Sequence, residues 1–140
     1  MRFERVLLPV DFSEYSEACM REAARLLFSD QAPEIHLLYV LHTPTDYSDW
    51  TGNPTADVQR HLDEFIERTK PAGAEKIEHA VKTGHPSTEI AKYAADHKCD
   101  LIMMATHGRT GLSHMLMGST AEQVVRHAPC PVLTVRVRPS

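Results

Sequence analysis

Short apolar runs alternate with amphipathic stretches along the chain, and this alternation restricts the possible fold more than any other feature of the sequence. The apolar runs, bounded by turn-forming residues, predict strands at residues 6–10, 35–41, 77–81, 100–105 and 131–137. Stretches with apolar residues three or four apart predict helices between them, at residues 13–28, 56–69, 87–97 and 119–127. Such regular alternation predicts the α/β class: a single doubly wound, Rossmann-like domain with a five-stranded parallel sheet and helices on both faces.

The size and composition of the chain narrow the classes of function. Its 140 residues correspond to one domain, over residues 1–140. The formal net charge of −4, with no basic run, argues against a nucleic-acid partner, because phosphates require clustered Lys and Arg. The longest apolar run, 101–105, is far shorter than the roughly 20 residues of a membrane helix. Three cysteines without a C-x-x-C pair, and a first segment unlike a signal peptide, predict a cytoplasmic protein.

The segments that follow the strands are the places to search for a ligand, since open parallel sheets bind ligands at the carboxyl ends of their strands. After the fourth strand, Gly108 and Gly111 allow the backbone to turn and to approach a ligand closely. Gly118-Ser119-Thr120 then begins a helix, whose first N–H groups and dipole favour an anion. The same residues also suit an ordinary helix start, with Ser119 as N-cap and Glu122 three residues later. The sequence contains no Walker A loop and no G-x-G-x-x-G motif.

Five segments, spread from the first strand to the last, resemble the universal stress protein family. They are Val6-Leu7-Leu8-Pro9-Val10-Asp11-Phe12-Ser13, Gly84-His85-Pro86, Thr106-His107-Gly108-Arg109-Thr110-Gly111, Gly118-Ser119-Thr120 and Ala128-Pro129-Cys130-Pro131-Val132. The nucleotide-binding branch of this family carries G-x2-G-x9-G-[ST] after the fourth strand. Gly108 and Gly118-Ser119 match the second part of that motif, whereas Ala105 stands at the position of its first glycine.

The resemblance implies a protein that binds an adenine nucleotide, with ATP as the first candidate and ADP or AMP as the others. It implies a nucleotide-dependent stress-response or signalling module and no turnover enzyme, with slow ATP hydrolysis as the most activity expected and no catalytic residue assigned. The predicted nucleotide-binding residues are Pro9, Val10, Asp11, Val40, Met104, Ala105, His107, Gly108, Arg109, Gly118, Ser119 and Thr120.

The family pattern also implies a role for most of these residues. Val10 and Asp11 would lie at the ribose and base, and Val40 and Met104 near the adenine. The residues expected to contact phosphates are Gly108, Arg109, Gly118, Ser119 and Thr120. Asp11 is the one candidate for helping to hold a Mg²⁺ ion on the phosphates, since carboxylate oxygens suit that ion. Capping of the first helix is an equally good and compatible role for Asp11.

The alanine at position 105 leaves two functions open. If the φ angle of Ala105 is negative, its methyl group costs little and only narrows the site; if φ is positive, alanine costs on the order of 1 kcal/mol and displaces the loop. The alternative to nucleotide binding is therefore a dimeric interaction protein of the same fold that has lost its ligand. An adenylating enzyme is disfavoured, because the glycine-rich pyrophosphate loop of such enzymes is absent after the first strand.

The last strand and the longest loop are candidate contact surfaces. The strand begins at Val132, ends at Val137 and is a candidate sheet edge, which a second chain frequently covers. The family resemblance supports a homodimer through this strand. The loop at 44–54 carries Tyr47 and Trp50, so it is a candidate lid or partner contact. The histidines show no metal-binding spacing on one helix, so they predict no metal site.

Overall fold

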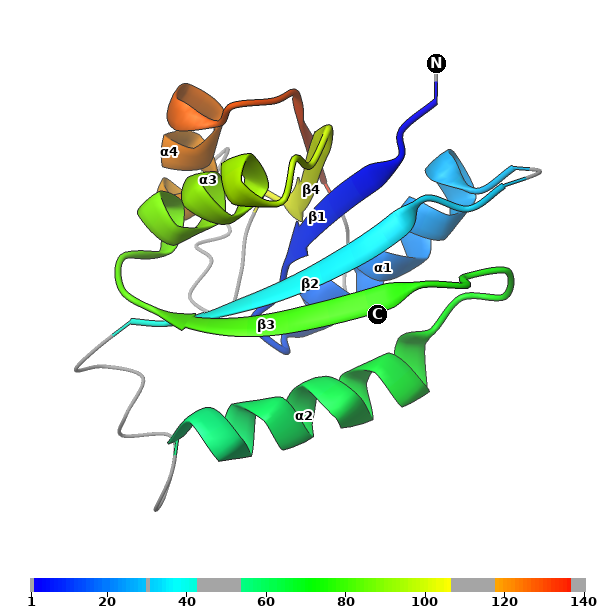
Figure 1. The fold of residues 1–140 in the computed structure, drawn as a ribbon, viewed down its shortest axis with the longest axis horizontal. Coiled ribbons are helices and arrows are strands. Elements are labelled where there is room, and N and C mark those ends of the chain that lie inside the picture. Colours follow the sequence, from blue (N-terminus) through cyan, green and yellow to red (C-terminus); the bar gives the residue numbers. More distant parts are fainter. Residues whose placement is uncertain (1, 30, 43–53, 107–117, 137–140) are drawn as a thin grey trace.

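The computed structural model describes residues 2–29, 31–42, 54–106 and 118–136. Within these residues the chain forms the nine alternating elements that the hydrophobic pattern predicts (Figure 1). In chain order they are β1 (Arg5–Pro9), α1 (Glu14–Leu27), β2 (Glu34–Leu41), α2 (Pro54–Thr69), β3 (Ile77–Thr83), α3 (Pro86–Asp96), β4 (Leu101–Ala105), α4 (Ser119–His127) and β5 (Val132–Val135). The predicted α/β class is confirmed.

All five strands are parallel and lie in the order β3-β2-β1-β4-β5. The chain builds outward from β1 through β2 to β3, then crosses back to place β4 on the other side of β1. The strand order therefore reverses between β1 and β4, the kind of position where open α/β sheets bind ligands. The ladder between β1 and β2 covers Arg5–Pro9, whereas the recorded β1–β4 pairs are Val6 with Leu101 and Leu7 with Ile102.

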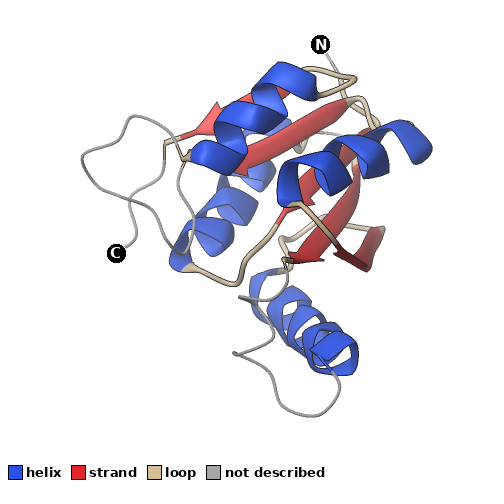
Figure 2. Cartoon of the chain, turned by 90° about the vertical axis from the view of Figure 1, so that its left-hand side faces the viewer, coloured by secondary structure: helices blue, strands red, loops and turns tan. Residues whose placement is uncertain are grey.

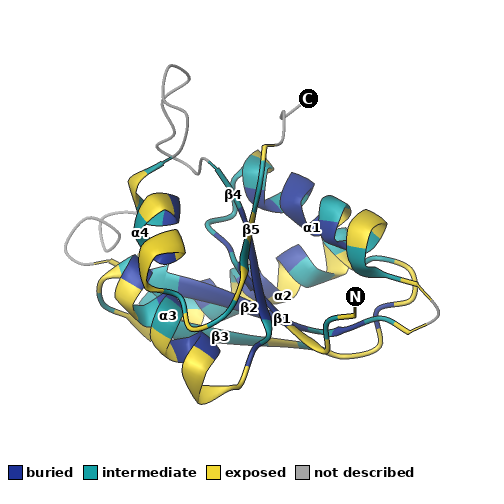
Figure 3. Ribbon diagram, turned by 90° about the horizontal axis from the view of Figure 1, so that it is seen from above, coloured by how far each residue is buried: buried dark blue, intermediate teal, exposed yellow. Residues whose placement is uncertain are grey.

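Helices lie on both faces of the sheet (Figure 2). Two apolar layers, one on each face, hold them there. Residues of α1 and α2, such as Met20 and Phe65, pack with Leu8 on one face. Residues of α3 and α4, such as Ile90, pack with Leu7 on the other. The central strands are therefore buried between helices whose outer faces are exposed (Figure 3). Each fully buried large apolar side chain contributes about 1.5–3 kcal/mol to the stability of the fold.

Several element boundaries differ from the sequence-based expectations. Helix α2 begins at Pro54, whose fixed φ suits a first helical turn, and β5 ends at Val135, before the predicted end. The predicted N-cap of α4 is wrong, because Gly118 is the N-cap and Ser119 is already helical. The Glu122 N–H donates to the Gly118 carbonyl at 3.0 Å, which makes that carbonyl the first acceptor of the helix.

Among the described residues, no helix is both long enough and apolar enough to span a lipid bilayer. The loop residues Tyr47 and Trp50 lie outside the described part of the chain, so their predicted role as a lid or partner contact stays a prediction.

Candidate functional site

The carboxyl end of β1 leads into a turn that its own side chains organise. The Val10 N–H donates to the Leu38 carbonyl at 2.9 Å, which extends the pairing of β1 with β2 by one residue. Asp11 Oδ1 then accepts from the Ser13 N–H at 3.0 Å, from Ser13 Oγ at 2.5 Å and from Ser16 Oγ at 2.8 Å. Ser13 is the N-cap of α1 and accepts from the Ser16 N–H at 3.3 Å. Asp11 therefore holds the cap in place and is not itself the capping residue.

Phe12, between this aspartate and the cap, has a left-handed backbone with φ of 64°. A non-glycine residue in that region costs roughly 1–2 kcal/mol, so the surrounding packing must hold it there. The Phe12 ring stacks on Tyr39 with centroids 4.9 Å apart and also contacts Phe65 at 6.0 Å. Sequence reasoning missed this strained position, because phenylalanine is not among the residue types that commonly adopt a positive φ.

The carboxyl end of β4 lies against the beginning of α4. The Thr106 N–H donates to the Val135 carbonyl at 3.0 Å, and the Gly118 N–H donates to the Thr106 carbonyl at 2.6 Å. These bonds place the first turn of α4, with Ser119 and Thr120, directly beside the end of β4. Because the N-cap is a glycine, the N-cap residue has no side chain of its own that could accept from the first N–H groups. The first N–H groups of α4 therefore suit an anionic group, as the sequence predicts.

Ala105, the alanine at the position of the family glycine, is the last residue of β4 and pairs with Val135. It is not among the described residues with positive φ. The methyl group thus sits on ordinary strand backbone, where alanine causes no strain. Of the two backbone conformations considered for this position, the structure has the one that alanine adopts without strain.

The remaining predicted residues divide between the two faces of the sheet. Met104 is buried and Val40 is half-buried, and both pack in the apolar layer beneath α3 and α4. Val10 packs instead in the layer beneath α1 and α2, and Pro9 is half-buried at the end of β1. The predicted phosphate-side residues His107, Gly108 and Arg109 lie outside the described residues.

Helix α3 also begins at this end of the sheet and brings two further histidines there. The ring centroids of His42, after β2, and His85, the N-cap of α3, are 5.6 Å apart. His85 Nδ1 is 3.0 Å from Ser87 Oγ, which donates to Gln123 Oε1 at 2.8 Å. This chain of contacts links the start of α3 to the middle of α4, and only the fold brings its members together.

The fold and sequence match those of characterised protein families. The family model described as the universal stress protein family matches residues 2–136. The chain is 31% identical to universal stress protein MJ0531 of Methanocaldococcus jannaschii, over 96% of this chain and 82% of that protein. The chain belongs to the universal stress protein family. Among curated universal stress proteins, one from Thermus aquaticus is 32% identical over 96% of this chain and 99% of its own length.

Solved structures of universal stress proteins share the whole architecture. The structure of MJ0577, also from Methanocaldococcus jannaschii, superposes with a TM-score of 0.85 at 27% identity and covers 100% of both chains. The universal stress protein UspA of Lactobacillus plantarum has a TM-score of 0.74 at 29% identity, over 97% of this chain and 99% of its own. The fold predicted from the sequence is thus that of known universal stress proteins.

Proposed function

We propose that this protein binds ATP, or a related adenine nucleotide, at the carboxyl ends of β1 and β4 and acts as a nucleotide-dependent stress-response or signalling module. In this proposal the phosphates lie at the start of α4, near Gly118, Ser119 and Thr120, and the base lies toward Val40 and Met104. Asp11 is proposed to lie at the ribose. Mg²⁺ is proposed to accompany the phosphates.

The observation that carries the proposal is the 2.6 Å hydrogen bond from the Gly118 N–H to the Thr106 carbonyl. It brings a helix start whose N-cap residue is a glycine to the point where the strand order reverses. A phosphate bound there would receive backbone N–H groups and the positive end of the helix dipole. The hydroxyls of Ser119 and Thr120 offer two further donors.

Relatives of the same fold provide the precedent for an adenine ligand. Universal stress proteins with TM-scores of 0.73 and 0.71 have been solved with cAMP and with AMP bound, the second from Arabidopsis thaliana. A universal stress protein from Archaeoglobus fulgidus, with a TM-score of 0.69, was solved with dAMP. These proteins are 18–23% identical to this chain, so they support the fold and its capacity for a nucleotide, and the choice of nucleotide rests on experiment.

The proposed assembly is a homodimer through β5. This strand lies at one edge of the sheet, and its Leu133 side chain is an exposed large apolar group. A second β5 strand could satisfy the open backbone groups of this edge and cover Leu133. Sedimentation at micromolar concentration is expected to give twice the mass of one chain. A species with the mass of a single chain would contradict the dimer.

The function is tested by identifying what the purified protein carries and what it binds. Freshly purified protein is denatured, and the released small molecules are separated by chromatography; ATP with Mg²⁺ is then titrated into ligand-free protein. We expect stoichiometric adenine nucleotide, or a micromolar dissociation constant, equivalent to about −8 kcal/mol. Absence of nucleotide together with no binding at millimolar ATP would favour the alternative, a dimeric interaction protein that has lost its ligand.

A further inference from the structure

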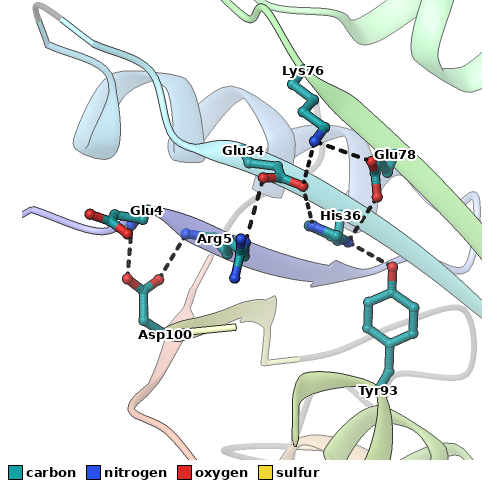
Figure 4. A network of polar contacts seen from close by, with 8 residues as sticks. All are labelled: Glu4, Arg5, Glu34, His36, Lys76, Glu78, Tyr93 and Asp100. Atoms are coloured by element: carbon teal, nitrogen blue, oxygen red, sulfur yellow. Dashed lines mark hydrogen bonds and ion pairs between the residues drawn. The ribbon is translucent and has the colours of Figure 1, made fainter. Parts of the chain in front are cut away.

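A second cluster of polar side chains lies at the opposite end of the sheet, where the strands begin. In the strand register, Arg5 of β1 is level with Glu34 of β2, and His36 of β2 is level with Glu78 of β3. Residues two apart on a strand share a face, so Glu34, His36 and Glu78 all lie on the face that α3 covers. Figure 4 shows these side chains converging from neighbouring strands, with Lys76 beside them.

The imidazole of His36 is the buried centre of this cluster, with a side chain only 3% exposed. Its Nε2 is 2.9 Å from Glu34 Oε1, and its Nδ1 is 2.7 Å from the hydroxyl of Tyr93 on α3. Glu78 approaches the same ring, with Oε2 at 3.8 Å from Nδ1. One ligand atom from each of Glu34, His36 and Glu78 can be chosen so that all three lie within 4.8 Å of one another.

The cluster already holds a cation. Lys76 Nζ is 3.4 Å from Glu34 Oε1 and 3.5 Å from Glu78 Oε1, so one ammonium group forms ion pairs with both carboxylates. Burial alone would raise the pKa of Glu34, but hydrogen bonds from His36 and Lys76 lower it. The hydrogen bond to Glu34 raises the pKa of Lys76 in turn. The contacts of Lys76 with both carboxylates therefore mark the space between Glu34 and Glu78 as a place that accepts positive charge.

Helix α3 adds to this preference. Its carboxyl-terminal end lies over the cluster, its last turn contains Tyr93 and Asp96, and no basic residue stands in that turn. The negative end of the helix dipole therefore points to the same region. His97, the C-cap, stacks on the Tyr93 ring with centroids 3.8 Å apart and helps to fix the hydroxyl that holds His36.

We propose that Glu34, His36 and Glu78 form a binding site for a divalent transition-metal ion of the Zn²⁺ type. One imidazole nitrogen and two carboxylate oxygens are ligands that Zn²⁺ accepts, with water in the remaining position. Tyr93 holds Nδ1 as an outer partner, which leaves Nε2 for the ion. On binding, the imidazole proton moves by exchange with water from Nε2 to Nδ1, which then donates to the Tyr93 hydroxyl oxygen. The Glu78 carboxylate lies nearest Nδ1, so this side chain, which is 46% exposed, must change its rotamer to reach an ion on Nε2.

Lys76 is the built-in competitor in this proposal. Its side chain is 61% exposed, so it can leave the carboxylates for solvent when the metal enters. Zinc binding at this site must therefore strengthen when the ammonium is removed, which a weak surface site on any other histidine would not do. The proposal does not depend on nucleotide binding, because the two sites lie at opposite ends of the sheet.

The test is a titration of metal-free, nucleotide-free full chain with Zn²⁺ against a chromophoric chelator, with Co²⁺ absorption as a second readout. We expect one ion per chain, and Glu78→Gln to weaken binding about tenfold or more. Lys76→Met is expected to tighten binding roughly fivefold, since it removes the competing ion pairs. Both positions are exposed enough for the variants to fold.

Two matched controls separate the site from general electrostatics. Glu75→Gln removes the same charge from an exposed position next to Lys76, and Lys82→Met removes a lysine from the far end of β3. Both are expected to leave zinc affinity within about twofold, given the weakness of exposed charge interactions. The proposal is overturned if Glu78→Gln has no larger effect than Glu75→Gln, if Lys76→Met does not tighten binding, or if no zinc binds below millimolar concentration.

Discussion

The two ends of the parallel sheet have opposite electrostatic character. At the carboxyl end, helices begin: α1 and α4 follow β1 and β4, and the N-cap of α4 is a glycine. At the amino end, α3 finishes above Glu34 and Glu78, with a lysine between the carboxylates. Because every crossover helix runs opposite to its strands, the helix dipoles favour anions at one end and cations at the other.

Within the carboxyl end, the two helix starts beside the strand reversal also differ. Helix α1 is capped by Ser13, which Asp11 holds in place, and its first turn carries Glu14 and Glu17. Helix α4 has Gly118 as its N-cap, followed by two hydroxyl residues and by Glu122 as the one acidic residue of its first turn. The N-cap of α1 is thus a serine whose hydroxyl accepts from the helix, whereas the N-cap of α4 is a glycine, and this difference is the reason that we propose the phosphate position at α4.

The largest effect is expected from a negative charge at the start of α4. Gly118→Asp is expected to weaken nucleotide binding roughly ten- to hundredfold, because the carboxylate competes for the same N–H groups and repels phosphate. Aspartate is a favourable N-cap, so the variant is expected to fold at least as stably as the parent. The measurement is ATP affinity by calorimetry, with thermal unfolding alongside.

Gly118→Asn is the matched control for that variant, because it has nearly the same size and capping ability without the charge. If the asparagine variant loses as much affinity as the aspartate variant, bulk and not charge is responsible. Zinc affinity is expected to be the same in both variants and in the parent, and an equal loss at both ends would show general damage instead.

The amino end can be tested through its buried hydrogen bond. Tyr93→Phe keeps the ring that stacks on His97 but removes the hydroxyl from His36 Nδ1. A buried imidazole nitrogen without a partner costs about 1–3 kcal/mol, and we expect the free energy of unfolding to fall by that amount in urea titrations. Nucleotide affinity should change less than about twofold, since additivity holds for distant sites. An unchanged stability would mean that water replaces the hydroxyl.

The dependence of stability on alkaline pH tests the burial of Cys19 in the apolar layer beneath α1 and α2, which lies between the two ends of the sheet. Burial, with a smaller effect of Glu22, raises the pKa of the Cys19 thiol from 9.0 to about 12. The folded state then holds this proton more tightly than the unfolded chain, so the stabilisation is complete below pH 9 and is lost as pH rises toward 12. Between pH 8 and 10.5, we expect the free energy of unfolding to fall by about 1–2 kcal/mol less in Cys19→Ala than in the parent, because the variant lacks this thiol. Denaturant titrations at the two pH values measure the difference.

A thiol nearer the surface supplies the comparison for that measurement. Cys130 is half-buried, and burial raises its pKa without a large shift. Cys130→Ala is expected to flatten the alkaline loss of stability less than Cys19→Ala does. Equal slopes in the two variants would contradict the assignment of the effect to Cys19.

The smallest effect is expected from restoring the family glycine. Ala105→Gly should lower the free energy of unfolding by about 0.5–1 kcal/mol, because glycine weakens a strand position that alanine occupies without strain. ATP affinity should shift by less than about threefold, equivalent to under 1 kcal/mol. A much tighter complex in Ala105→Gly would mean that the methyl group obstructs the nucleotide in the parent.

Much of the fold could be predicted from local patterns, and the errors fall where partners are distant in sequence. The apolar runs located every strand, and Gly118-Ser119-Thr120 located the start of α4. Ser119 was the wrong cap because serine and glycine both suit that position, and the bond from Gly118 to Thr106 decides between them. The positive φ of Phe12 depends on packing against Tyr39, 27 residues away in the chain.

The sequence also contained a sign of the cluster at the amino end of the sheet, but a search for metal-binding spacing on a single helix does not detect it. Glu34 and His36, like Lys76 and Glu78, are polar residues two apart at the start of a strand, so each pair shares a face of the sheet. That pattern predicts a polar patch at the beginning of two strands. Only the pairing of β2 with β3 shows that the two patches are one.

The sequence by itself determined the alternation of elements, the α/β class and the helix start that suits an anion, because these depend on residues close together in the chain. The tertiary structure decided which strand ends meet, that Ala105 lies on unstrained backbone, and that Glu34, His36, Glu78 and Tyr93 come together. The physical reason is that strand order and register join distant residues through hydrogen bonds between backbones, whose donors and acceptors are the same in nearly every residue.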